Sequence, residues 1–226
     1  MSEREVADVR GRFSVTGELD AACKDVDIVI EAIIEDKAAK LDILVKIAAI
    51  VRPDTLIATN SSYMVSSTFK EVVPHPERLA NLHYFMPALV MKLVEVVKGA
   101  HTSEETVERL MQFARSVGKT PVYVRKEEDG FIVNNILKAI KEEAYRLVGE
   151  GVCTVQDLDT AVELGLNHPM GPFKIDDMNG LDLRYSILKR RYEETGVKSY
   201  GYGMIETLCE QGRYGKRVKH GFYDYE

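Results

Sequence analysis

The stretch "DIVIEAIIEDKAAKLDILVKIAAIVRPDTLIATN", Asp27–Asn60, contains two apolar runs of strand length separated by a segment with helical spacing. The first run, "DIVIEAI", is interrupted only by Glu31, and the second, "TLIATN", has the composition of a buried strand. The segment between them places four apolar residues on one helical face: Leu41, Leu44, Val45 and Ala48. A helix between two buried strands is the unit of a parallel sheet, so this stretch predicts an α/β fold.

The same alternation continues to about residue 126. "RLANLHYF", "KLVEVVK" and "TPVYVR" predict three further strands. Before the last of them, "TSEETVERLMQFARSVG" predicts a helix that opens with a Thr102-x-x-Glu105 capping box and closes at Gly118. We therefore expect a largely parallel sheet with helices between its strands.

After "KEEDG", Lys126–Gly130, the strand patterns stop. "FIVNNILKAIKEEAYRLVGEG" predicts a long amphipathic helix whose apolar face contains Val133, Ile136, Leu137, Ile140, Ala144 and Leu147. Thr154-x-x-Asp157 caps the next predicted helix, and two or three more helical segments follow. We expect a boundary near residue 128 that separates a sheet-containing domain, 1–127, from an all-α domain, 128–226.

Composition limits the class of protein. The formal net charge of −6 argues against a nucleic-acid surface. Three cysteines lie far apart with no metal-ligand spacing, so we expect no metal site and a reducing, cytoplasmic environment. The N-terminus is charged from the start, and the longest apolar runs are shorter than a membrane span, so we expect neither a signal peptide nor a membrane partner.

Two polar residues, His83 and Glu95, each lie inside an apolar run that predicts a strand. Glu95 alternates with Leu93 and Val97, so its side chain points the same way as two apolar ones. It either lies on the wet face of an edge strand or pairs with His83. A carboxylate beside an imidazole favours the charged ring and fixes its orientation, as in a general acid/base. A lone histidine at such a position is more often structural.

Small hydroxyl and amide residues follow a predicted buried strand in "ATNSSYM", Ala58–Met64. Ligands of open α/β sheets bind beyond the carboxyl ends of the strands. No G-x-S-x-G turn surrounds Ser61 or Ser62, so the pattern disfavours a serine hydrolase and favours hydroxyls that bind a substrate oxygen or a cofactor. Alternatively, Ser66 or Ser67 caps a helix at "STFKEVV".

Six motifs occur in order along the chain: "VDIVIEAIIED", "ATNSS", "LHYFMPALVMKLVEVVKG", "DGFIVNNIL", "HPMGPFKIDDMNGLD" and "GRYGKRVKHGFYDY". From residue 12 onward the sequence resembles the NAD-dependent L-3-hydroxyacyl-CoA dehydrogenases, including the bacterial 3-hydroxybutyryl-CoA dehydrogenases. The resemblance implies a Rossmann-type doubly wound sheet followed by a helical domain that forms a homodimer. It also implies oxidation of L-3-hydroxyacyl-CoA to 3-oxoacyl-CoA, or the reverse, in fatty-acid or butyrate metabolism.

The resemblance implies roles for individual residues. His83 is the acid/base on the 3-hydroxyl, and Glu95 orients it. Ser62, rather than its neighbour Ser61, holds the substrate oxygen, and Asn134 contacts the substrate. The implied contacts to NAD are made by Ala32, Glu35, Lys40, Asn60 and Ser62.

One motif departs from the family pattern. Where the family commonly has His-Phe-Phe-Asn-Pro, this chain has His83-Tyr84-Phe85-Met86-Pro87. A thioether cannot donate the hydrogen bond that an amide can. We expect this change to affect substrate preference or a nicotinamide contact.

The front of the family's first domain has no counterpart, because no G-x-G-x-x-G turn is present and Gly201-Tyr202-Gly203 lacks the third glycine. We expect a partial, N-terminally truncated Rossmann-type sheet in which "RFSV" is a short strand and NAD affinity is reduced. "DIVIEAI" would have an unpaired edge, covered by self-association or by a rearranged N-terminal segment.

Other interpretations remain open beside that of a working dehydrogenase. The chain is weakly active or inactive, or its missing half comes from another polypeptide. It is alternatively a non-catalytic dimeric relative that binds acyl-CoA or has a structural role. A further alternative is a dehydrogenase for another hydroxy acid.

Overall fold

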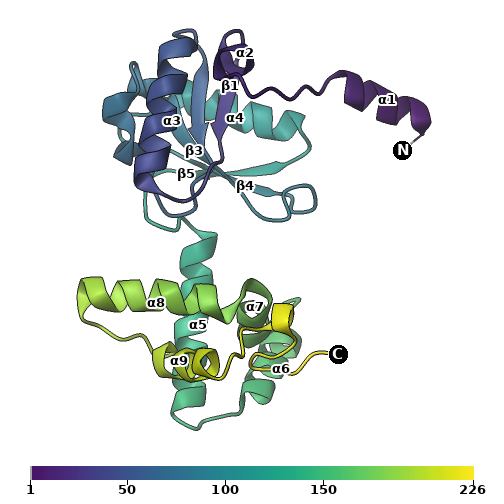
Figure 1. Cartoon of the computed structure of the whole chain (residues 1–226), viewed down its shortest axis with the longest axis vertical. Coiled ribbons are helices and arrows are strands. Elements are labelled where there is room, and N and C mark those ends of the chain that lie inside the picture. The colour runs from purple at the N-terminus through teal and green to yellow at the C-terminus, as the bar shows by residue number, and fades with distance from the viewer. Residues whose placement is uncertain (1) are drawn as a thin grey trace. The chain divides into compact units, whose positions relative to one another are not determined.

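The computed structural model describes residues 2–226, which form two compact units. The first unit ends at Ile132, and the second is Val133–Glu226. Figure 1 shows a helix-flanked sheet in the first unit and helices in the second. Within residues 2–226 no helix combines the length and apolar character needed to cross a membrane.

The sheet of the first unit has five strands that lie side by side in chain order: β1 Ile28–Glu31, β2 Leu56–Thr59, β3 Leu79–Tyr84, β4 Leu93–Val97 and β5 Thr120–Val124. Neighbouring strands are parallel except β3 and β4, which are antiparallel. The connection between β3 and β4, residues 85–92, is too short for the crossover that a parallel pair requires. The predicted, largely parallel α/β sheet is confirmed.

Helices cover both faces of this sheet (Figure 1). On one face, α3 Lys37–Ile50 packs its Leu44 against Ile57 of β2. On the other, α4 Glu104–Ser116 packs its Leu110 in the same cluster as Leu56. Because successive strand residues point to opposite faces and both faces are covered, every residue of β2 is buried, and only the last of them, Thr59, is polar.

The N-terminal part of the first unit differs from the prediction. "RFSV", residues 12–15, forms no strand and is exposed, and the helix before it, α1 Glu3–Gly11, has no buried residue. A short helix, α2 Leu19–Cys23, follows. A four-residue strand is not stable without a neighbour to share its hydrogen bonds, and no strand formed by residues 2–226 pairs with this segment.

Strand β1 therefore has one open edge within the described residues. It pairs with β2 alone, and residues 2–18 are all exposed rather than folded over it. The predicted cover by a rearranged N-terminal segment is wrong. Cover by self-association stays a prediction.

Two predicted helix starts are also corrected. The N-cap of α4 is Ser103, whose Oγ accepts from the N–H of Thr106, whereas the hydroxyl of Thr102 donates to the carbonyl of Leu79. "STFKEVV" forms two 3₁₀ turns, Ser66–Thr68 and Lys70–Val72, in which neither Ser66 nor Ser67 is an N-cap. A third 3₁₀ turn, Pro76–Arg78, leads into β3.

The second unit is helical, as predicted, and contains α5 Val133–Gly149, α6 Val155–Gly165, α7 Pro172–Asn179, α8 Leu181–Thr195 and α9 Tyr202–Glu210. Thr154 caps α6 through a hydrogen bond from the N–H of Asp157, which confirms the predicted cap. The unit's core includes Tyr145, Phe173, Leu181 and Ile205. A 3₁₀ turn, Lys216–Val218, leads into the C-terminal segment.

The closing "KHGFYDY", residues 219–225, docks its aromatic residues onto this unit. Phe222 and Tyr223 pack against the core, and both of their N–H groups donate to the carboxylate of Asp177. The hydroxyl of Tyr225 donates to the same carboxylate. A buried carboxylate with three donors has the partners that its burial requires.

Candidate active site

Strand register brings His83 and Glu95 together. The two residues are paired directly across the antiparallel strands β3 and β4, so their side chains leave the same face of the sheet. His83 Nδ1 lies 2.9 Å from Glu95 Oε2, and the two side chains are only 4% and 1% exposed. β4 lies between β3 and β5, so the interpretation of Glu95 as a wet edge position is wrong.

The orientation of the imidazole is fixed from several sides. Because a carboxylate only accepts hydrogen bonds, the Nδ1 of His83 carries a proton and donates to Glu95. The second oxygen of Glu95 accepts from the N–H of Ile132 at 3.1 Å, which holds the carboxylate in turn. The rings of Phe85 and Phe131 lie 4.6 and 5.3 Å from the imidazole, centroid to centroid. The nitrogen left for chemistry is Nε2.

Ser62 lies at that nitrogen. Its Oγ is 3.1 Å from His83 Nε2, and its side chain, unlike that of His83, is half-buried. Ser61 points elsewhere, because its hydroxyl donates to Glu35. Ser62, His83 and Glu95 therefore form a hydrogen-bonded line that ends in a partly accessible hydroxyl. The line can exchange a proton with an oxygen bound beside Ser62.

A second group of charges lies at the carboxyl end of β1. Lys40 of α3 is 1% exposed, and its Nζ lies 2.8 Å from Glu31 Oε1 and 3.3 Å from Glu35 Oε2. Glu31 also accepts from the hydroxyl of Thr59 at 2.6 Å and from the N–H of Ile33 at 2.7 Å. A buried ammonium group needs such partners. The structure directs Lys40 to two carboxylates of its own chain.

Glu35 holds the turn that carries Ser62. One of its oxygens, Oε1, accepts from the Ser61 hydroxyl and from the N–H groups of Ser62 and Tyr63, at 3.1 and 3.2 Å. Burial raises the pKa of Glu35, but these hydrogen bonds and the Lys40 charge outweigh it and bring the pKa below the ordinary value. Glu35 is therefore ionised at neutral pH.

The remaining predicted residues are placed as follows. Asn60 uses its Oδ1 to accept from the N–H of Tyr84 at 2.8 Å, which ties the end of β2 to β3. Ala32 is exposed just beyond β1, and Met86 is 80% exposed beyond β3. Asn134 belongs to the second unit, in the first turn of α5. His101 is half-buried, and its Nε2 lies 3.4 Å from the hydroxyl of Ser66.

Sequence reasoning missed two members of the site region. Glu31 interrupts an apolar run that predicts a strand, which is the same pattern that identifies Glu95 as a candidate. Asn81, fully buried in β3, donates through Nδ2 to the carbonyl of Met64 at 2.9 Å and accepts from the N–H of Ser66 at 2.7 Å. The signal that could have identified Glu31 and Asn81 is a polar side chain within an apolar run that predicts a strand.

The nicotinamide end of a dinucleotide fits these residues. Exposed Ala32 and half-buried Ser62 follow β1 and β2 at the edge where ligands of α/β sheets bind, and both side chains are small. Residues 2–226 contain no glycine-rich turn between a strand and a helix that could hold the pyrophosphate. Within the same residues, no group of three or more histidine, cysteine or acidic side chains is arranged to hold a metal ion.

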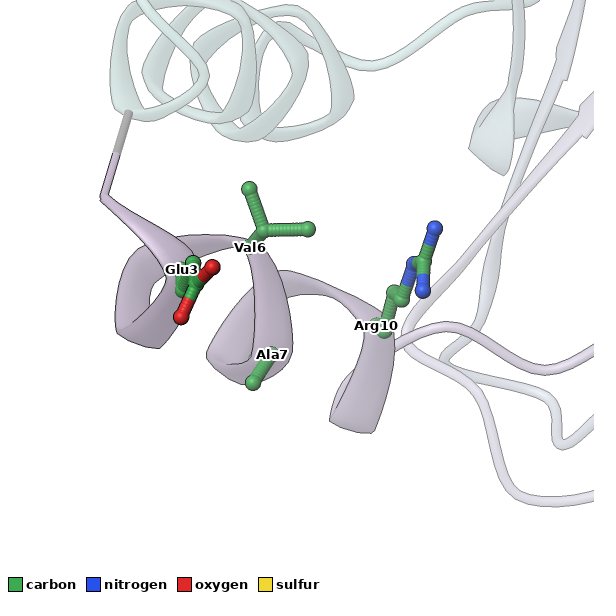
Figure 2. Close-up of a pocket in the computed structure, with 4 residues that line it drawn as sticks. All are labelled: Glu3, Val6, Ala7 and Arg10. Atoms are coloured by element: carbon green, nitrogen blue, oxygen red, sulfur yellow. The ribbon is translucent and has the colours of Figure 1, made fainter.

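A depression elsewhere in the first unit is formed by one helix alone. It is lined by Glu3, Val6, Ala7 and Arg10, which all belong to α1 (Figure 2). All four residues are exposed, and no side chain of another element contributes to the lining.

Serine, histidine and glutamate also form hydrolase triads, so the line of hydrogen bonds does not by itself define the reaction. The reaction is defined by comparison with known proteins. The family model "3-hydroxyacyl-CoA dehydrogenase, NAD binding domain" matches residues 1–128, and "3-hydroxyacyl-CoA dehydrogenase, C-terminal domain" matches residues 130–225.

Three similar proteins are named as 3-hydroxybutyryl-CoA dehydrogenases. A probable 3-hydroxybutyryl-CoA dehydrogenase of Bacillus subtilis is 38% identical over 226 residues, which is 100% of this chain and 78% of that protein. The 3-hydroxybutyryl-CoA dehydrogenase of Clostridioides difficile is 36% identical over 203 residues, which is 89% of this chain and 72% of that protein. The crystal structure of (S)-3-hydroxybutyryl-CoA dehydrogenase from Ralstonia eutropha superimposes with a TM-score of 0.89 at 32% identity, over 100% of this chain and 80% of that one.

Proposed function

The chain belongs to the 3-hydroxyacyl-CoA dehydrogenase family, and we propose that Ser62, His83 and Glu95 perform the acid/base step of its reaction. The reaction is the NAD-dependent oxidation of an L-3-hydroxyacyl-CoA to the 3-oxoacyl-CoA, or its reverse. The observation that carries the proposal is the line of contacts from Ser62 Oγ through both nitrogens of His83 to Glu95, at 3.1 and 2.9 Å.

Each residue of the line has a distinct role. In the oxidation direction, His83 Nε2 accepts the proton of the substrate's 3-hydroxyl, and Glu95 stabilises the positive charge that develops on the ring. The Ser62 hydroxyl donates to the substrate oxygen and keeps it beside Nε2. When bound, NAD accepts the hydride that leaves C3. In the reverse direction His83 returns the proton.

We propose a substrate with a short acyl chain, 3-hydroxybutyryl-CoA for the oxidation and acetoacetyl-CoA for the reverse reaction. The similar proteins of Bacillus subtilis and Clostridioides difficile are named as 3-hydroxybutyryl-CoA dehydrogenases. The test is acetoacetyl-CoA reduction followed by the loss of NADH absorbance. We expect His83→Gln to lower kcat by about 10²-fold or more, since general acid/base groups contribute that much. His75→Gln is the matched control, because His75 is exposed outside the site. Unchanged kcat in His83→Gln would contradict the assignment.

The same assay separates the other interpretations. A wild-type chain that binds acetoacetyl-CoA without consuming NADH would support a non-catalytic relative. NADH oxidation with a free 3-oxo acid but not with its CoA ester would support a dehydrogenase for another hydroxy acid.

We further propose that residues 1–127 bind the cofactor, that Asn134 contacts the substrate, and that residues 128–226 form a homodimer. An apolar groove of about 300 Å³ on the second unit supports the dimer; it is lined by Val133, Ile136, Leu137, Ile140, His168, Met170, Pro172 and Ile175. Ile136 is 56% exposed in the single chain. Ile136→Lys should shift the mass measured by light scattering toward a monomer.

A reducing compartment such as the cytoplasm is also proposed. It is supported by the three cysteines, Cys23, Cys153 and Cys209, none of which forms a disulfide. Fractionation of cells that express the protein would test it.

A further inference from the structure

The serine-rich segment Ser61–Ser67 is held by a carboxylate at each end. At its start, Glu35 Oε1 accepts from the Ser61 hydroxyl and from the N–H groups of Ser62 and Tyr63. At its end, Glu127 Oε1 accepts from the hydroxyl of Ser66 and the N–H of Ser67, at 2.7 and 2.8 Å. The two carboxylates bind the same kinds of donor, but only Glu35 binds the residue that contacts His83.

The position of the Ser62 hydroxyl depends on this arrangement. A serine side chain is short, so its oxygen moves with the backbone that carries it. Three hydrogen bonds from consecutive residues to a single oxygen define that backbone, and two of them come from the N–H groups of Ser62 and Tyr63. No helix or strand includes residues 60–65, so these bonds replace regular structure there.

Glu35 is itself held from the opposite side. Its second oxygen lies 3.3 Å from Lys40 Nζ, and the same ammonium lies 2.8 Å from Glu31. Lys40 and Glu31 are buried, whereas the side chain of Glu35 is 40% exposed. The buried pair at the end of β1 therefore supports a carboxylate that reaches outward to the serine turn.

We propose that Glu35 is a positioning residue, which acts through Ser62 by fixing the turn that presents its hydroxyl to His83. Lys40 is then the support of Glu35. This inference rests on the proposed acid/base site and assigns Glu35 a role other than the cofactor contact that the family resemblance implies.

A double-mutant cycle in acetoacetyl-CoA reduction tests the proposal. We expect Glu35→Ala to lower kcat by roughly 10- to 100-fold, the range that a displacement of about 1 Å at a reacting group produces. Ser62→Ala should lower kcat by a comparable factor. The kcat of the double variant should be no lower than that of the less active single variant, because both changes remove the contact between Ser62 and His83. Glu35→Gln keeps an acceptor oxygen and should recover part of the loss.

Two results would overturn the positioning role. If the losses in kcat multiply in the double variant, Glu35 acts independently of Ser62. If Glu35→Ala raises KM for NADH and leaves kcat unchanged, Glu35 is a cofactor contact. Should Glu35→Ala fail to fold, the cycle is run with Glu35→Gln, whose loss of kcat must likewise disappear in the Ser62→Ala background.

Glu127→Gln is the matched control. It weakens two hydrogen bonds to the far end of the same segment and leaves the bonds of Ser62 in place. We expect a lower melting temperature with kcat within about twofold of the wild type, as for a change away from the reacting groups. A loss of kcat equal to that of Glu35→Ala would mean that any loosening of the segment suffices, and the specific role of Glu35 would be wrong.

A readout without cofactor or substrate separates this proposal from the proposed function. In protein with ¹⁵N-labelled histidine, the His83 ring signals are assigned by their loss in His83→Gln. Glu35→Ala should move the His83 Nε2 signal in the direction seen for Ser62→Ala, and Glu127→Gln should leave it unmoved. An inactive wild type with this response would overturn the dehydrogenase reaction alone. An unmoved His83 signal in Glu35→Ala would overturn the positioning role.

Discussion

The first and second units each bury a carboxylate with a hydrogen-bond donor beside it, but the hydrogen-bonded groups around the two carboxylates end differently. In the first unit, the buried pair of His83 and Glu95 continues through Nε2 to the half-buried hydroxyl of Ser62. In the second, Lys141 donates to Asp176 Oδ1, and the hydroxyl of Tyr145 donates to Asp176 Oδ2 at 2.6 Å. All three residues of the second cluster are buried.

The difference separates a site for chemistry from a support for the fold. A buried charge costs free energy in either place and is tolerated because it is paired. The cluster around Asp176 ends in side chains that are themselves buried, so no external molecule is needed to complete it. The line from Glu95 ends at an atom that an outside molecule can reach. Exposure at one end, rather than burial of the pair, marks the site.

The largest effect is expected when a substitution removes Asp176 from the buried cluster of the second unit. Asp176→Ala leaves the ammonium of Lys141 buried without its carboxylate, which costs about 3–5 kcal/mol for a buried pair. Urea unfolding should show this loss in the free energy of unfolding. A loss below about 1 kcal/mol, the range of exposed pairs, would contradict the buried, structural character of the cluster.

The corresponding change in the first unit acts on catalysis. Glu95→Gln keeps the size of the side chain and removes the charge that stabilises the developing imidazolium. We expect kcat for acetoacetyl-CoA reduction to fall about 10²-fold, since electrostatic groups of this kind contribute on that scale. The free energy of unfolding should change less than in Asp176→Ala. If the order of the two stability losses is reversed, the contrast between the units is wrong.

A smaller effect tests whether the two units respond separately. Ser103→Ala removes the cap of α4 in the first unit, and Thr154→Ala removes the cap of α6 in the second. Each should cost about 1 kcal/mol. Hydrogen exchange should show faster exchange in the unit that carries the substitution, with the other unit as internal control. Equal acceleration in both units from one substitution would show that they unfold as one body.

The pH dependence of stability gives the smallest effect. The pKa of Glu35 is held below its ordinary value of 4.5 by the Ser61 and Tyr63 hydrogen bonds and by Lys40, which together outweigh burial. A lowered acid pKa stabilises the folded state above the ordinary value, and the contribution is lost as pH falls through the lowered pKa. The stability difference between wild type and Glu35→Gln should therefore be largest near neutral pH and shrink in acid. A difference that grows in acid would reverse the sign of the pKa shift.

Much of the fold is predictable from local pattern. The strands at "DIVIEAI" and "TLIATN" form as predicted because largely apolar runs of that length are typical of strands in a sheet covered by helices on both faces. The α6 cap is found at Thr154 because a side-chain hydroxyl and the N–H three residues later are fixed by helix geometry alone. "RFSV" is wrong as a strand because a strand needs a partner, and the pattern of one segment cannot supply it.

The site divides in the same way. The sequence by itself determined that His83 and Glu95 stand out, because a charged or titratable side chain inside an apolar strand demands a partner. Only the tertiary structure decided who the partners are. The register of β3 against β4 sets Glu95 opposite His83, and the path of the turn after β2 directs Ser62 to His83 and Ser61 to Glu35. Hydrogen bonds depend on distance and direction between atoms far apart in the chain, and residue types do not encode these quantities locally.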